Sequence, residues 1–166
     1  SIDYDPKSEA TQTFYKEVQN KLLFAVSGQT AAELVYYRAN ASLPMMGLTT
    51  TKVPGKVRKA DVTTGKNYLT EEELQALKLI VEQYLAFAEA QAHAQRPMYM
   101  KDWIDRLGLI LTMNKYTILD HAGKITHELA VREAEEQYAL YRKHEREIQH
   151  LESIRELDRD LKALKR

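Results

Sequence analysis

The last segment of the chain, from Thr126 to Arg166, contains neither Gly nor Pro and is dominated by Glu, Arg, Lys, Leu and Ala. These residue types favour helix, so the segment predicts one long C-terminal helix over about residues 126–166. Unbroken, it would span roughly 60 Å at 1.5 Å per residue. A compact domain of this size has a radius of gyration of only about 15 Å. The helix must therefore kink, protrude, or pack against another chain.

One face of this segment carries apolar residues at the alternating three- and four-residue steps of a coiled coil. They are Ile154, Leu157, Leu161 and Leu164. Asp158 and Lys162 stand four apart, the spacing of a favourable ion pair. The pattern predicts a homodimer through the C-terminal helix. Two heptads are fewer than the roughly three or four that a coiled coil requires, so a partly solvated helix packed back on its own domain is an equal alternative.

Start and stop signals divide the rest of the chain into helices. Asp5 before Pro6 is a good N-cap, and Gly28 is a good stop. Capping-box spacing recurs at Thr30–Glu33 and Thr70–Glu73. The expected helices run from about residue 5 to 28, from 30 to about 38, from 70 to about 95, from 99 to 113, and over the last segment. The prediction is an all-α single domain of about five helices over residues 1–166.

The stretch from about Asn40 to Tyr68 shows no helical period and is predicted to be a long basic loop between helices. Its cations are Lys52, Lys56, Arg58, Lys59 and Lys66, and they oppose only Asp61. Loops of this kind carry function or wrap the outside of a core. Lys56, Arg58, Lys59 and Lys66 are therefore the candidate contacts to phosphate or nucleic acid.

Charge and composition narrow the function classes. Lys plus Arg and Asp plus Glu are both 24, so the net charge is +0. A broad nucleic-acid face normally has a basic excess, so we expect this chain to bind DNA only weakly. The absence of cysteine excludes disulfides and thiolate sites and favours a reducing compartment. No apolar run approaches the roughly 20 residues of a membrane span, and no signal peptide is present, so a cytoplasmic location is expected.

Many residues match one known family in order and spacing. They are Val18-Gln-Asn-Lys-Leu22, Ala25-Val26, Gly28, Thr30-Ala-Ala-Glu33, Arg38-Ala39, Met46-Gly-Leu48, Asp61-Val62, Lys66-Asn-Tyr-Leu69, Tyr84-Leu85, Phe87-Ala-Glu89, Met100, Asp102-Trp103 and Gly123-Lys-Ile125. The chain resembles the C-terminal domain of the RhuM virulence-protein family as far as about residue 142. It departs from the family pattern at Gly65, where Ala is expected, and at Thr51, where Trp is frequent.

The resemblance implies a bacterial protein, often encoded on pathogenicity islands or other mobile elements. It also implies an N-terminal region resembling phage antirepressor-type DNA-binding domains. That region is absent here, and the chain opens Ser-Ile-Asp without an initiator Met, so we expect a fragment of a longer protein. Any specific DNA contact would belong to the missing region. No activity carries over from the family, so no catalytic residue does either.

Four polar residues inside the matching segments are weak catalytic candidates: Glu33, Arg38, Asp61 and Lys66. In the functional interpretation Lys66 binds a phosphate and Asp61 serves as a base or metal ligand. In the structural interpretation, which is favoured, Glu33 completes a capping box, Arg38 ties down the loop, and Asn67 turns the chain into the next helix. A single Asp is a poor start for a two-metal nuclease site.

The five histidines are scattered, and they give no metal motif. Two HExxH matches begin at His127 and His144 but fail at Val131 and Ile148. No P-loop, GxGxxG or GxSxG pattern is present, so no metal and no cofactor is predicted. The sequence predicts an interaction or assembly module of a DNA-linked regulator. The alternative is an enzyme that acts on nucleic acid or a nucleotide through the 40–68 loop.

Overall fold

The computed structural model describes residues 1–164 of the chain. This part contains six α-helices and two short 3-10 helices. The elements are α1 (Glu9–Ser27), α2 (Ala31–Arg38), η1 (Pro44–Gly47), α3 (Lys59–Val62), η2 (Gly65–Tyr68), α4 (Glu71–His93), α5 (Met100–Met113) and α6 (His127–Leu164). The predicted all-α class and long last helix are confirmed. The final two positions of the predicted helix, 165 and 166, lie outside the described residues.

Most of the predicted helix starts and stops are confirmed. Both capping boxes form, at the starts of α2 and α4, and Gly28 ends α1 with a left-handed φ of 71°. The predicted cap at Asp5 is wrong by three residues. Ser8 caps α1 instead, with its hydroxyl accepting from Thr11 N at 3.1 Å. The Asp5 side chain accepts from Lys7 N and closes the turn before the helix.

The stretch from 40 to 68 is less loose than the sequence suggests, because it contains η1, α3 and η2. Five of its larger apolar side chains are buried and anchor these turns to the core. They are Met46, Leu48, Val57, Val62 and Tyr68. Around Pro54-Gly55 the chain reverses direction, with one isolated bridge between Val53 and Lys56. Turns this short leave no period in the sequence, so pattern analysis could not find them.

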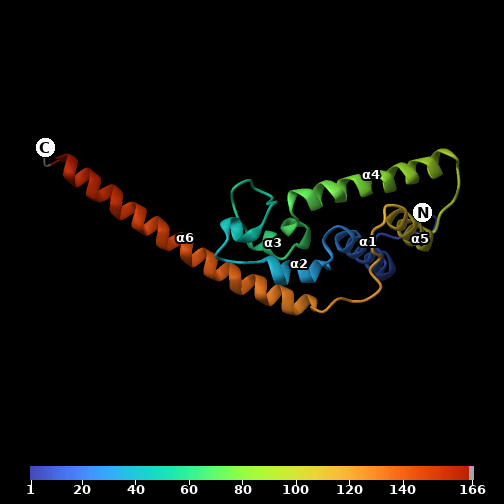
Figure 1. The fold of residues 1–166 in the computed structure, drawn as a ribbon, viewed down its shortest axis with the longest axis horizontal. Coiled ribbons are helices and arrows are strands. Elements are labelled where there is room, and N and C mark those ends of the chain that lie inside the picture. The colour runs from blue at the N-terminus through green and yellow to red at the C-terminus, as the bar shows by residue number, and fades with distance from the viewer. Residues whose placement is uncertain (165–166) are drawn as a thin grey trace.

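The core is divided between two ends of the molecule (Figure 1). At one end α1, α4 and α5 pack around Ile80, Leu107 and Leu111. At the other end α2 and the 40–68 turns pack on α6 around Met46, Val62 and Ala134. A small cluster of Leu23, Leu34 and Leu69 joins α1, α2 and the start of α4.

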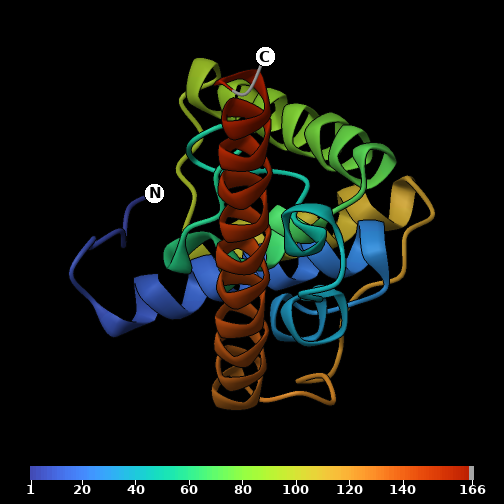
Figure 2. The ribbon, with the colours of Figure 1, turned by 90° about the vertical axis from the view of Figure 1, so that its left-hand side faces the viewer.

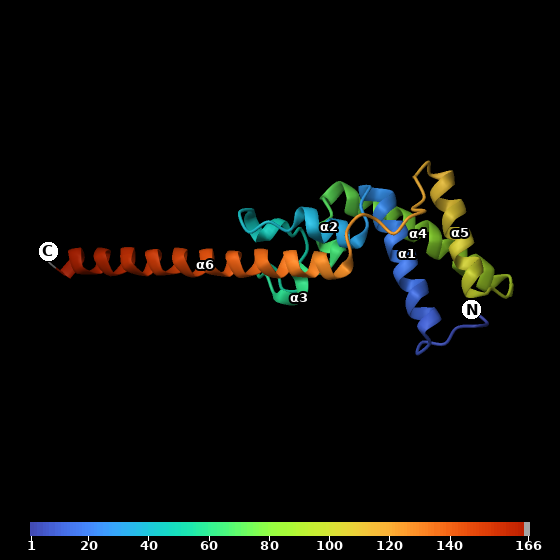
Figure 3. The ribbon, with the colours of Figure 1, turned by 90° about the horizontal axis from the view of Figure 1, so that it is seen from below.

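The final helix α6 lies along one side of this body and then continues beyond it (Figures 1 and 3). Ala130 and Ala134 are buried against the body, whereas every residue from 146 to 164 is exposed. Figure 2, seen from the side to which the helix projects, shows α6 in front of the other helices. The long segment therefore protrudes, and only its first half packs back on its own domain. Within residues 1–164 no helix is both long and apolar enough to cross a membrane.

Candidate functional site

The carboxylate of Asp61 is enclosed by donors from its own turn. Asp61 is 4% exposed. Both of its oxygens accept from the Arg58 guanidinium at 3.2 Å, and the backbone N–H groups of Arg58 and Lys52 donate at 3.1 and 3.3 Å. Its ion pair with Arg58 holds the pKa of Asp61 below its usual value. Four donors on one carboxylate close the turn between residues 52 and 61.

Arg38 joins three elements through one guanidinium. It makes a bidentate pair with Glu73 of α4, with Nη1–Oε1 at 2.5 Å and Nη2–Oε2 at 3.0 Å. The same group donates to the carbonyl of Tyr68 at 3.0 Å and to the Gln29 side chain at 3.0 Å. The Arg38 guanidinium lowers the pKa of Glu73. Arg38 thus ties the end of the 40–68 segment to α2 and α4, as the structural interpretation predicts.

Glu33 completes the capping box of α2, with its Oε1 accepting from Thr30 N at 3.0 Å. The box is buried beneath Gly123, which has a φ of +81°. A Cβ at Gly123 would lie 2.8 Å from Thr30 Cγ2 and 3.0 Å from Glu33 Oε1. Glycine at this position therefore allows the segment before α6 to close over the start of α2.

The basic residues of the 40–68 segment do not form one patch. Arg58 pairs with Asp61, and Lys59 pairs with Glu135 of α6 at 3.1 Å. Among the described carboxylates none lies within 4 Å of the ammonium groups of the remaining three, Lys52, Lys56 and Lys66, which are exposed. Two of the four predicted phosphate contacts, Arg58 and Lys59, thus form ion pairs with carboxylates of the same chain.

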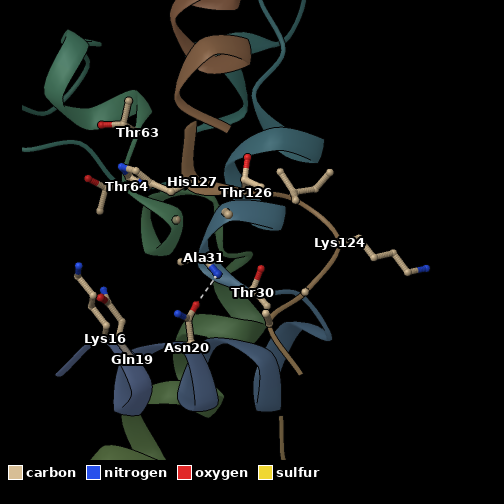
Figure 4. A pocket seen from close by; sticks show the side chains of 15 residues that line it. Lys16, Gln19, Asn20, Thr30, Ala31, Thr63, Thr64, Lys124, Thr126 and His127 are labelled. Atoms are coloured by element: carbon tan, nitrogen blue, oxygen red, sulfur yellow. Dashed lines mark hydrogen bonds between the residues drawn. The ribbon is translucent and has the colours of Figure 1, made fainter. Parts of the chain in front are cut away.

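A half-open cavity of about 640 Å³ lies where α1, the start of α2, the turn after α3 and the start of α6 meet. Lys16 and Gln19 reach toward it from α1, and His127 and Thr64 lie across from them, whereas the Lys124 side chain points away (Figure 4). Asn20 accepts from Ala31 N at 2.9 Å beside the opening. None of the four catalytic candidates lines this cavity.

The cavity wall offers hydroxyl, amide, ammonium and imidazole groups but no carboxylate among its lining residues. It therefore lacks the paired acids of general acid–base chemistry and the carboxylate ligands of most divalent-cation sites. Over residues 1–164 no three His, Asp or Glu side chains gather as a metal site requires. The sequence does not predict this cavity, because its residues come from four separate segments.

A second candidate surface is the exposed row of α6, defined as Ile154, Leu157, Leu161 and Leu164. Each residue of this row is between 49% and 83% exposed. At about 100° per residue, the row lies roughly 180° around the helix from Ala130 and Ala134, which face the body. The row is therefore an apolar face that the domain itself does not cover.

Comparison with protein-family models matches residues 1–149 to the model described as Virulence protein RhuM family. This match covers most of the chain. The chain belongs to the RhuM family. No curated protein and no solved structure matches it. The RhuM match ends inside α6, before the exposed row begins.

Three of the segments that carry the RhuM resemblance meet at the cavity. They are residues 18–22, 30–33 and 123–125. Gly65, one of the two departures from the family pattern, also lies there. A Cβ at Gly65 would come within 2.8 Å of Ala31 O and 2.9 Å of Ala31 Cα. In this RhuM protein the turn and α2 approach too closely for the alanine that the family pattern suggests.

Proposed function

We propose that this RhuM chain is the interaction and assembly module of a bacterial DNA-linked regulator that works in the cytoplasm, and that it forms a homodimer through α6. The observation that carries the proposal is the exposed row of α6 on a helix that projects beyond the body. A soluble monomer rarely leaves an aligned set of leucines open to water unless they meet a partner.

The energetics favour a weak, reversible dimer. Burying the remaining exposed part of each row residue is worth about 1 kcal/mol, since full burial of Leu or Ile is worth roughly 1.5–3 kcal/mol. A dimer would bury two such rows. The total is near the 4–15 kcal/mol estimated for the loss of translational and rotational freedom on association. The row by itself therefore supports only weak, reversible association, and the concentration series below measures its dissociation constant.

The alternative, an enzyme working through the 40–68 segment, gains no support from the contacts. Glu33 completes a helix cap, Arg38 links α2 to α4, and Asp61 closes a turn. Lys66 is exposed and lies outside the cavity lining. With three separate lysines and a net charge of +0, few phosphates can be neutralised, so DNA binding by this chain is weak and without sequence preference.

The experiment is light scattering over a range of micromolar concentrations on the wild type and on Leu157→Asp/Leu161→Asp. The wild-type mass should rise from 19.2 kDa toward twice that value, and the double variant should stay monomeric. Its melting temperature should match that of the wild type at concentrations where the wild type is monomeric. Leu85→Asp is the matched control, because Leu85 of α4 is equally exposed and remote from α6. A wild type that stays at 19.2 kDa throughout would refute the proposal.

A further inference from the structure

We infer that two copies of this chain pair antiparallel through α6, with the two-fold axis near residue 152. This inference rests on the proposed homodimer and adds its direction, its register and the contacts that hold it. The argument uses the heptad positions of α6 between residues 140 and 164 and the charges beside them.

The heptad pattern of the exposed row continues toward the body as a longer seam. Its members are Leu140, Lys143, Glu147, His150, Ile154, Leu157, Leu161 and Leu164. All eight are exposed. The seam covers roughly 37 Å of helix and about three and a half heptads, and five of its eight members are apolar. Its length is in the range of a two-stranded coiled coil.

The polar middle of the seam decides the direction of pairing. In a parallel pair each residue faces its own counterpart, so Lys143 would face Lys143 and Glu147 would face Glu147. Like charges directly opposite each other oppose pairing. In an antiparallel pair centred near residue 152, every polar member faces an apolar one. The resulting layers are Leu140 with Leu164, Lys143 with Leu161, Glu147 with Leu157, and His150 with Ile154.

The residues beside the seam support the same register. Antiparallel pairing places Arg146 of one copy next to Asp160 of the other, twice by symmetry. Arg146 donates only to the Arg142 carbonyl, and Asp160 has no ion-pair partner among the described residues. Leu151, which is exposed just outside the seam, meets Leu151 of the second copy near the axis. These contacts are self-complementary, which is what a two-fold interface requires.

The body leaves room for this pairing. The seam lies on the side of α6 opposite Ala134 and Tyr141, which pack against the domain. In Figure 1 the other helices of the body lie on one side of α6. In the antiparallel pair the two bodies lie at opposite ends of the paired helices. The eight seam residues are exposed, so a second copy can reach them.

Cysteine cross-linking tests the direction, because the natural chain has no cysteine. The variants are Glu147→Cys and Leu157→Cys, each oxidised alone and as an equimolar mixture. A disulfide needs Cα atoms about 4.4–6.8 Å apart. In the antiparallel register position 147 faces position 157 of the other copy, whereas the two 157 positions are offset by roughly 15 Å along the axis.

The expected result is a covalent heterodimer in the mixture and little cross-linking of either variant alone. Efficient cross-linking of Leu157→Cys alone would establish a parallel pair, which overturns this inference and leaves the proposed dimer intact. A wild type that is monomeric by light scattering would overturn both. The two failures are thus distinguishable.

A charge exchange tests the register independently. Arg146→Asp should weaken the dimer roughly tenfold, because it affects two symmetry-related contacts. Adding Asp160→Arg should restore the wild-type dissociation constant. Arg159→Asp is the control, since Arg159 lies opposite the seam and should change affinity by less than the Arg146 variant. A double variant that stays as weak as Arg146→Asp would reject the register.

Discussion

The two halves of α6 have the same helical backbone but different reasons for being helical. The inner half buries Ala130 and Ala134 in the core beneath α2, and Tyr138 and Tyr141 pack beside them. The outer half, from about residue 146, packs against no other element of the body and keeps its leucines exposed. Tertiary packing stabilises the first, whereas the second depends on helix propensity and local ion pairs.

Local ion pairs help the outer half to stay helical without a core. Lys162 bonds Asp158 at 2.6 Å, and Arg142 bonds Glu145 at 2.7 Å where the helix leaves the body. Each such pair contributes only a few tenths of a kcal/mol. A helix supported in this way alone is marginal, so the pairing that we propose for α6 would stabilise it.

The largest effect is expected from overfilling the inner half. Ala134 is fully buried among Val35, Met46 and Tyr68. Ala134→Leu should lower the free energy of unfolding by about 1–3 kcal/mol, because three extra carbon atoms must displace a packed core. Urea denaturation measures the change as a lower midpoint at an unchanged slope.

Ala163→Leu is the matched control in the outer half. Alanine and leucine have similar helix propensity, and Ala163 is exposed on the side away from the seam. Its effect should stay within about 0.5 kcal/mol. Equal destabilisation by both substitutions would show that the two halves do not differ in packing as described.

A smaller effect is expected from the ion pair that fastens the body. Arg38 lowers the pKa of Glu73 in the folded chain. In the unfolded chain the pKa of a Glu side chain is about 4.3. The stabilisation is therefore fully present above the unfolded value and is lost as the pH falls through the lower folded value. Glu73→Gln should cost about 1 kcal/mol at pH 7, and the difference from wild type should shrink toward zero below about pH 4.

Urea titrations at several pH values measure this dependence, with Glu72→Gln as the control. Glu72 lies in the same first turn of α4 but makes no ion pair among the described residues. Its loss should cost only a few tenths of a kcal/mol through the helix dipole. A Glu73→Gln penalty that persists unchanged at pH 3 would mean that the charge on Glu73 is not its source.

Much of the fold could be predicted from local sequence signals. Both capping boxes, Gly28 and the long segment without Gly or Pro gave α1, α2, α4 and α6 nearly complete. The length of the last segment also predicted that it must kink, protrude or find a partner. Such signals act within a few residues of each other, so they survive in a single sequence.

The rest depends on contacts between distant residues. Two ion pairs join elements that are far apart in the chain, Arg38 with Glu73 and Lys59 with Glu135. The spacing of these residues in the sequence does not predict that they meet. The cavity is also formed by residues that are distant in the sequence, because four separate segments line it. Gly123 is a weak sequence signal, because a glycine before the last helix indicates a turn. It does not indicate the buried capping box beneath that turn.

The smallest change in stability is expected from removing the outer half altogether. A chain that ends at Arg142 keeps Ala130, Ala134 and Tyr141, and it loses no buried residue of the described part. Its free energy of unfolding should stay within about 0.5 kcal/mol of the full chain. The comparison must be made well below the dissociation constant, because dimer formation stabilises the folded full chain by mass action.

The same truncation should abolish self-association in light scattering. A dimer that survives it would place the interface on the body, whereas a loss of several kcal/mol would mean that residues beyond 142 support the core.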